Sequence, residues 1–329
     1  MCYRRLVMGS FATFSLAMGL GLTVQPVLAQ RTRSLELDRD VYTPVWQTMP
    51  KWRGKLLLRV EKNDTKAPVI DALDRDGYHE DILFDIPDSS LVGVTGTGAS
   101  SDGSIVVGGY AFSADSRRAS LIAWIAPDRQ RRTVIRTVPF EATAVTLAAD
   151  GTIWAVGNTW DNVKRANNTK NVIQRYDTAG KLLSSLKVLE LESPARIHGD
   201  ANERSYLMAS RDRVGWFTNS NQYIEFSLDG IELNRFDGPT GIEDSTPPDG
   251  VALSDANDLV VGRKVGKGRG TELLVLDRPT REWVPVSVPG QKPGAWLAVF
   301  GFDGTTLVAS PTSGKLLRLR LVEDPSGKK

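Results

Sequence analysis

The side chains that most often carry out chemistry are scarce in this chain. It has two histidines, His79 and His198, and one cysteine, Cys2. A zinc site with three histidine ligands is therefore impossible. Cys2 lies in an N-terminal segment that resembles an export signal, so after cleavage no thiol would remain for a nucleophile, a disulfide or a thiolate metal site. The sequence also has no Gly-x-Ser-x-Gly elbow, phosphate-binding loop or dinucleotide fingerprint.

One acidic stretch, Asp74-Arg75-Asp76-Gly77, superficially resembles a calcium-binding loop. The calcium pattern requires an acidic or amide residue where this chain has Ala72, and a glutamate where it has Leu83. A tight turn between two strands is the favoured interpretation. His198 lies in a predicted inner strand and could face the axis of the fold, but a lone histidine there is more often structural.

The elements that position these residues come from a short sequence repeat that recurs about six times. One copy is the turn Asp150-Gly151 followed by the apolar strand 152–157. The aligned strands begin at residues 55, 104, 152, 205, 258 and 305, and a period of about 20–50 residues is typical of solenoids, propellers or arrays. Glycine and asparagine in the turns suit a positive φ angle. Chance spacing of strands in a β-sandwich is the alternative.

Each repeat predicts four strands, which we label a to d, with the turn between a and b. In the fourth repeat, for example, a is 195–199, b is 205–210 and c is 223–227. Many short apolar strands bounded by turn residues favour an all-β fold. The last repeat ends after its c strand at 315–321, and the alternating segment 34–38 has no other partner. We expect this segment to supply the missing outer strand.

The phrase of strand a, Asp-Gly turn and strand b, repeated over 47–53 residues, resembles bacterial six-bladed β-propellers of the NHL-repeat and gluconolactonase-like kind. The resemblance covers most of residues 35–325 and concerns the fold, because no catalytic signature accompanies it. It implies a single domain, 30–329, of six four-stranded antiparallel blades closed by the N-terminal strand 34–38. The expected blades are 41–89, 90–139, 140–190, 191–238, 239–290 and 291–325.

The gluconolactonase-like enzymes hold a divalent cation with Glu, Asn and Asp side chains at the axis. By position, Glu141, Asp200 and Asp249 are the candidates here, with His198 beside them, but they do not match that motif residue by residue. A lactonase or hydrolase with Ca²⁺ or Mg²⁺ in the central channel is therefore the second functional hypothesis. Several acidic or amide side chains converging on the channel would favour it.

The first hypothesis is a non-enzymatic propeller, without cofactor, that binds a protein, a glycan or a small molecule on one face. The b–c and d–a loops emerge on the same face, which we call the loop face. The b–c loops are long and basic and the d–a loops are acidic, so we expect an acidic inner rim inside a basic ring. Exposed tryptophans would suit a sugar ring or a protein contact. The candidate ligand-binding residues are Trp160, Arg211, Arg213, Trp216, Lys264 and Arg269.

Residues 1–29 predict an export signal. Arg4 and Arg5 precede an apolar run that extends to about Val24, and small residues up to Ala29 predict cleavage before Gln30. We therefore expect a periplasmic or secreted protein, exported by the general or the twin-arginine route. A membrane anchor is the alternative, although the run is short for a span and contains several Gly and Ser residues.

The nearly balanced charge of the chain does not indicate a polyanionic partner. The chain has 41 Lys and Arg against 39 Asp and Glu, and Arg4 and Arg5 are the only charged residues in the predicted signal. The mature chain would then carry 39 charges of each sign. Proteins that bind nucleic acids usually show a basic excess, so we do not expect nucleic acid as a partner. We expect a monomer.

Overall fold

The computed structural model describes residues 33–42, 51–53, 56–74, 77–161, 166–167, 172–187, 205–218, 220–242, 248–266, 270–292, 294–312 and 315–323. The chain divides into two units, Met1–Arg31 and Thr32–Lys329. All described strands belong to the second unit. None of the described residues forms a helix long and apolar enough to cross a membrane.

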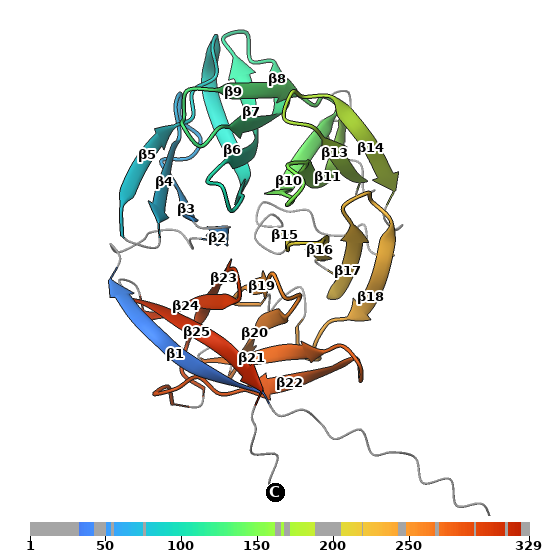
Figure 1. The fold of residues 1–329 in the computed structure, drawn as a ribbon. Coiled ribbons are helices and arrows are strands. Elements are labelled where there is room, and N and C mark those ends of the chain that lie inside the picture. Colours follow the sequence, from blue (N-terminus) through green and yellow to red (C-terminus); the bar gives the residue numbers. More distant parts are fainter. Residues whose placement is uncertain are drawn as a thin grey trace, which may run out of the picture. The chain divides into compact units, whose positions relative to one another are not determined.

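The second unit is an all-β propeller of six antiparallel sheets, as predicted (Figure 1). Blade 1 is β2 (Lys51–Arg53), β3 (Leu56–Glu61), β4 (Val69–Asp74) and β5 (His79–Leu83). Blade 2 is β6 (Ser89–Ala99), β7 (Ile105–Ser113), β8 (Arg118–Ile125) and β9 (Arg132–Arg136). Blade 3 is β10 (Phe140–Leu147), β11 (Ile153–Asp161), β13 (Val172–Tyr176) and β14 (Leu182–Lys187), with β12 (Ala166–Asn167) paired to the end of β11.

The other three blades have the same order from the inside outward. Blade 4 is β15 (Tyr206–Ala209), β16 (Arg213–Phe217), β17 (Gln222–Ser227) and β18 (Glu232–Asp237). Blade 5 is β19 (Val251–Leu253), β20 (Leu259–Val265), β21 (Gly270–Asp277) and β22 (Glu282–Val286). Blade 6 is β23 (Ala298–Asp303), β24 (Thr306–Thr312), β25 (Lys315–Glu323) and β1 (Arg33–Tyr42).

Strand β7 shows why the second strand of a blade is a continuous apolar run. Ile105, Val106 and Val107 are all fully buried, although successive side chains of a strand point to opposite faces of the sheet. Ile105 and Val107 pack with Leu58 of blade 1, whereas Val106 packs with apolar side chains of blade 3. Both faces of a blade are therefore covered by its neighbours.

The N-terminal strand closes the last blade, as the sequence predicted. β1 pairs antiparallel with β25, with Leu35 opposite Leu321 and Leu37 opposite Leu319. The pairing extends from Arg33 to Tyr42, well beyond the expected 34–38. Leu35 is 3 % exposed and packs in the cluster shared by blades 5 and 6.

Blade 4 differs from the prediction by one strand. Segment 205–210 was expected to be the second strand, but β15 is the innermost strand of its sheet and β16 takes the second place. The second strands of blades 1 to 6 begin at residues 56, 105, 153, 213, 259 and 306, so the third interval is 60 residues and the others are 46 to 49. Additional chain between β14 and β15 therefore shifted the apparent period, and the inner strand expected at 195–199 lies outside the described residues.

Arginines tie neighbouring blades together. Arg129, in the turn between β8 and β9, donates to Glu80 of β5 at 3.0 Å. Arg278, in the turn between β21 and β22, lies 2.6 Å from the buried carboxylate of Glu225 on β17. Arg175 of β13 donates to the Asp229 carbonyl in the next blade at 2.7 Å. Each contact joins an outer turn or strand to the adjacent blade, which reinforces the apolar packing between blades.

Candidate functional site

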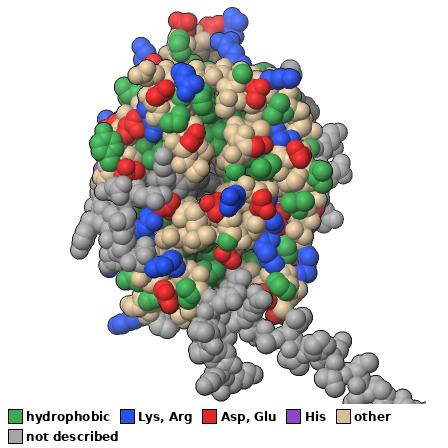
Figure 2. Space-filling view, in the orientation of Figure 1, with side chains coloured by type: hydrophobic (Ala, Val, Ile, Leu, Met, Phe, Trp, Pro, Cys, Tyr) green, Lys and Arg blue, Asp and Glu red, His purple; other side chains and the backbone are tan. Residues whose placement is uncertain are grey.

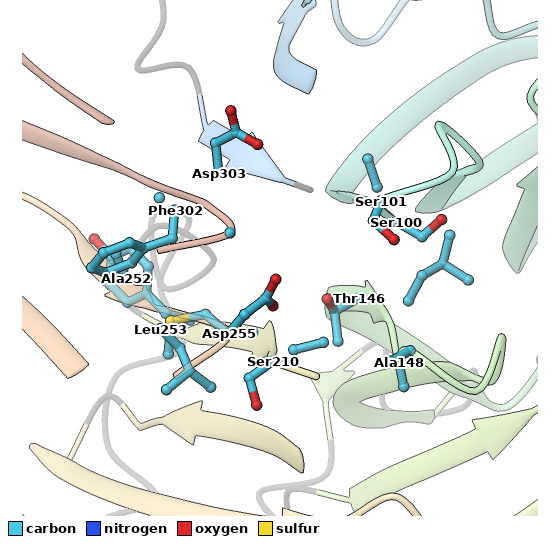
Figure 3. Close-up of a pocket in the computed structure, with 18 of the residues that line it drawn as sticks. Ser100, Ser101, Thr146, Ala148, Ser210, Ala252, Leu253, Asp255, Phe302 and Asp303 are labelled. Atoms are coloured by element: carbon cyan, nitrogen blue, oxygen red, sulfur yellow. The ribbon is translucent and has the colours of Figure 1, made fainter. Parts of the chain in front are cut away.

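A cavity of about 920 Å³ occupies the centre of the propeller. Its wall consists of the inner strands of blades 2 to 6 and the turns that join them to the second strands, at 100–104, 148–152, 210–212, 254–258 and 304–305. We call the side of the propeller that carries these turns the turn face. Figure 3 shows Ser100, Ser101, Thr146, Ala148, Ser210 and Asp255 around the open centre.

Small residues allow the inner strands to approach one another around this cavity. A Cβ atom on Gly98 would lie 2.9 Å from Thr146 Cα in the next blade. Gly250 has φ +135°, and a Cβ atom there would lie 2.0 Å from the carbonyl oxygen of Val299. Because only glycine avoids these contacts, both positions fix the spacing of adjacent blades.

Blades 5 and 6 are joined at both ends of their inner strands. The Val299 N–H donates to the Asp249 carbonyl at 3.0 Å, and the Asp255 N–H donates to the Gly304 carbonyl at 2.9 Å. Asp255 is thus held at a defined place on the rim of the cavity. Its turn also contains Asn257 with φ +68°, the positive φ that glycine supplies in the turns at Gly103 and Gly151.

Three carboxylates stand at the turn-face end of the cavity, and their environments differ. Asp102 accepts the backbone N–H of Ser104 at 2.8 Å and so caps its own turn. Asp303 is nearly buried and accepts Arg318 Nη2 at 2.8 Å. Asp255 is exposed to the cavity, and among the described residues no group donates a hydrogen bond to its carboxylate. Partial burial is the main cause that raises the pKa of Asp255. Arg211 opposes the rise, and the Asp303 carboxylate adds to it.

A fourth carboxylate, Asp249, lines the cavity at the loop-face end. It accepts the Thr271 hydroxyl at 2.6 Å and lies 3.6 Å from Lys264 Nζ. Burial raises the pKa of Asp249, although the Thr271 hydroxyl and Lys264 oppose the rise. The predicted candidates Asp249 and Lys264 therefore form one pair, and both face the channel.

Glu141, the other described candidate for the channel mouth, is committed to a contact between blades. It lies on β10, is 7 % exposed, and forms a two-pronged pair with Arg118 of β8. The guanidinium of Arg118 stacks 4.3 Å from the ring centre of Tyr110, whose hydroxyl donates to Asp64 at 2.6 Å. Burial is the main cause that raises the pKa of Tyr110 to about 12, and the bond to Asp64 adds to it. The acidic inner rim expected on the loop face is thus neutralised at Glu141 and Asp249.

The structure corrects three of the predicted loop-face residues. Trp216 was expected to be exposed, but it lies on β16, is 1 % exposed, and donates from Nε1 to Ser205 Oγ at 2.7 Å. Arg211 and Arg213 were expected on the loop face, but they lie at the turn between β15 and β16, which is on the turn face. Arg213 contacts Asp212 at 3.1 Å and Glu225 at 3.2 Å, and the bond to Asp212 is the main cause that raises its pKa. All three errors follow from the shifted strand assignment in blade 4.

Trp160 was expected in a polar loop, but it belongs to β11 and pairs with Asn167 of β12. The remaining candidates, His198, Asp200 and Arg269, lie outside the described residues. Within the described parts of the chain, no group of three or more His, Cys, Asp or Glu side chains is arranged to hold a metal ion. Figure 2 shows acidic and basic side chains interspersed over the visible face, in keeping with the balanced composition.

Asp255, Asp303 and Thr146 are site residues that the sequence analysis did not select. The Asp-Gly phrase of the repeat recurs at Asp303-Gly304, where Gly304 has φ +62°, but the place of this turn beside the axis was not used. A usable signal existed, because the inner strands of a propeller crowd the axis and the turns that end them must surround the channel mouth.

The comparisons with known proteins include a partial match to a curated protein. No protein-family model matches the chain. A mouse protein, NHL repeat-containing protein 3, is 29 % identical over 157 residues, which are 47 % of this chain and 40 % of that protein. The resemblance holds at the level of the fold. Because the match spans less than half of the mouse protein, its role is not carried over to this chain.

Solved structures with a similar arrangement include three bacterial or archaeal proteins. A gluconolactonase from Xanthomonas campestris has a TM-score of 0.46 at 15 % identity, with 90 % of this chain and 93 % of that chain covered. The β-propeller domain of a trilobed protease from Pyrococcus furiosus has a TM-score of 0.47 at 12 % identity, with 87 % and 82 % covered. A protein of unknown function from Bacteroides caccae has a TM-score of 0.43 at 13 % identity, with 76 % and 81 % covered.

Proposed function

We propose that this chain is a non-enzymatic binding propeller that holds its ligand in the central cavity, entered from the turn face. The observation that carries the proposal is the cavity itself, about 920 Å³ and walled mainly by small side chains. Ligand sites typically measure about 300–1,000 Å³ and combine an apolar wall with a few polar groups that fix orientation. Here Ala148, Ala252 and Leu253 supply apolar wall, and Asp255 and Thr146 supply polar groups.

The proposal moves the binding site from the loop face to the channel. Two of the cationic residues expected on the loop face, Arg211 and Arg213, lie on the turn face, and Trp216 is in the core. The turn face, by contrast, offers short rigid turns around a deep cavity. Binding residues concentrate where loops are held by a rigid scaffold, and these turns meet that condition.

A metal-dependent hydrolase with a divalent cation in the channel is the second candidate, favoured by the buried carboxylate of Asp249. To hold a cation, Asp249 would have to break its ion pair with Lys264, whose Nζ lies 3.6 Å away. The cation would also need about six oxygen ligands around it. Asp249 has the Thr271 hydroxyl beside it, but Glu141 is paired with Arg118. The binding role therefore fits the described side chains better.

Closing the cavity mouth tests the proposal. Ser101 is exposed on the turn between β6 and β7 and lines the cavity, so Ser101→Trp would place a large ring at the mouth without altering the core. We expect a thermal-shift screen of neutral sugars, carboxylates and amines to find a compound that stabilises the wild-type protein and not this variant, because ligand binding to the folded state raises its melting temperature.

Ser185→Trp is the matched control, since Ser185 is exposed on the outer strand β14, away from the cavity. It should respond to the same compound as the wild type does. A compound that stabilises the Ser101→Trp variant as strongly as the wild type would place the binding site elsewhere and contradict the proposal.

Export is part of the same proposal. Arg4 and Arg5, the apolar run and Ala29 support cleavage before Gln30. Expression of the full chain in a bacterial host should yield a periplasmic or secreted product whose first residue, determined by N-terminal sequencing, is Gln30. Recovery of an uncleaved chain from the cytosol would contradict it.

A further inference from the structure

The turn-face end of the cavity holds a carboxylate that has no partner among the described residues. Asp255 lines the cavity, and among the described residues nothing donates a hydrogen bond to its side chain or forms an ion pair with it within 4 Å. Its backbone is fixed by the bond from its N–H to the Gly304 carbonyl at 2.9 Å. An ionised carboxylate that is fixed in place and has no described partner is stabilised by a cation that enters the cavity beside it.

A second, independent group points into the same space. Thr146, on the inner strand β10, is only 2 % exposed and lines the cavity, yet its hydroxyl has no hydrogen-bond partner among the described residues. The hydroxyl opens onto the cavity, so a group bound there can supply its missing hydrogen bond. Figure 3 shows the Thr146 hydroxyl and the Asp255 carboxylate both directed into the open centre.

We propose that this end of the cavity binds an organic ammonium group, which donates hydrogen bonds to Asp255 and Thr146. The ammonium belongs either to a free primary amine or to a lysine side chain. This inference rests on the proposed function, because it assigns the ligand class of the same cavity.

The arrangement suits an ammonium group better than a divalent metal ion or a neutral polyol. An ammonium has only N–H donors and no acceptor, and the Asp255 carboxylate and the Thr146 hydroxyl oxygen can both accept from it. Ca²⁺ takes six to eight oxygen ligands, more than these side chains supply once Asp303 has accepted Arg318 at 2.8 Å. A neutral polyol would leave the negative charge of the Asp255 carboxylate uncompensated. Ala252 and Leu253 beside Asp255 offer apolar surface for the methylene chain of an amine.

The charge of Arg211 should affect amine binding in the opposite direction to the charge of Asp255. Arg211 is exposed, lines the cavity, and is near enough to Asp255 to lower that residue's pKa against the larger effect of burial. A bound ammonium would be repelled by the positive charge of the Arg211 guanidinium. Removing the charge of Arg211 should therefore strengthen amine binding, whereas removing the charge of Asp255 should weaken it.

The test is isothermal titration of the mature protein with cadaverine, with pentanediol as the neutral probe of the same shape, and with CaCl₂. A blocked Gly-Gly-Lys-Gly-Gly peptide and its glutamine analogue separate a lysine side chain from a free amine. The variants are Asp255→Asn, Arg211→Gln and the control Asp150→Asn. Asp150 occupies the equivalent turn of blade 3, and its Oδ1 atom, which accepts the Thr152 N–H at 2.9 Å, is kept in asparagine.

We expect cadaverine or the lysine peptide to bind and the neutral probes not to bind. Loss of a charge-assisted hydrogen bond should weaken binding about tenfold or more in Asp255→Asn. Arg211→Gln should bind several-fold more tightly, and Asp150→Asn should match the wild type. Binding of the peptide alone identifies a lysine side chain as the ligand, and binding of cadaverine alone identifies a free amine.

Three results would overturn the inference: no amine binds, pentanediol binds as well as cadaverine, or Asp255→Asn binds like the wild type. Calcium binding that depends on Asp255 without any amine binding would also overturn it. If amines fail while another compound stabilises the wild type and not Ser101→Trp, the proposed function stands and only the ammonium assignment falls.

Discussion

Replacing Trp216 by alanine is expected to lower the free energy of unfolding by about 3–5 kcal/mol, the usual cost of truncating a buried aromatic residue. Trp216 is 1 % exposed and packs in the cluster that joins blades 3 and 4, together with Trp154 and Phe226. Its indole N–H donates to Ser205 Oγ at 2.7 Å, so truncation also leaves a buried hydroxyl without its donor. Urea unfolding followed by circular dichroism measures the change.

Alanine variants of two further tryptophans serve as controls for this measurement. Trp154 is fully buried, lies 6.0 Å from Phe226 between ring centres, and should lose as much stability as Trp216 when changed to alanine. Trp283 is only partly buried, and its Nε1 donates to the Asp237 carbonyl on the surface of blade 4, so Trp283→Ala should cost clearly less. A cost for Trp216→Ala no greater than that for Trp283→Ala would show that Trp216 is exposed in solution, as the sequence had suggested.

The misplacement of Trp216 has a physical origin. Inner and second strands are both buried on two faces, so segments such as 206–209 and 213–217 have the same apolar composition. In blades 2, 3, 5 and 6 a Gly or Asn with positive φ separates the two strands, at Gly103, Gly151, Asn257 and Gly304. The turn of blade 4 at 210–212 has no residue with positive φ. With that marker missing and extra chain before β15, the repeat period and the turn signal of Asn202 together assigned the strand to the wrong place.

The fold was predictable because its signals are local, whereas the site depends on pairing between residues far apart in the sequence. Strand runs, turn dipeptides and the unpaired segment at 34–38 are each visible within a few residues. By contrast, Glu141 is neutralised by Arg118, and Asp303 by Arg318 on another strand of the same blade. Asp102 and Asp150 cap their own turns, so of four similar turn carboxylates only Asp255 has no described partner. Nothing in the dipeptide pattern distinguishes it.

Deleting residues 33–42 is expected to lower the melting temperature by roughly 5–10 °C. The deletion should cost about 3 kcal/mol or more of folding free energy, and each kcal/mol lowers the melting temperature by about 2 °C or more in a domain of this size. The deletion removes the buried side chain of Leu35 and exposes the edge of β25 along the register from Lys315 to Glu323. It also opens the ring at blade 6. Thermal unfolding of the shortened and full chains compares them directly.

Point variants separate the effect of burial from the effect of chain length. Leu35 and Leu37 lie on the same strand and pair with Leu321 and Leu319, but Leu35 is 3 % exposed and Leu37 is 47 % exposed. Leu35→Ala should cost about 2–5 kcal/mol, as for a buried leucine, and Leu37→Ala should cost much less. Equal and small effects would mean that β1 does not pack against blade 6 in solution.

Adding the missing strand back provides the sharpest test of closure. A synthetic peptide of residues 30–45 should raise the melting temperature of the shortened chain in a concentration-dependent way, because it binds only the folded state. The same peptide with Leu35 changed to serine should be much weaker, since it would bury an unpaired hydroxyl in the cluster of blades 5 and 6. An unpaired β25 edge also invites pairing between two shortened chains, so dimers that disappear on addition of the peptide are expected in size-exclusion chromatography. An unchanged melting temperature after deletion, with no response to the peptide, would show that the ring is stable without its N-terminal strand.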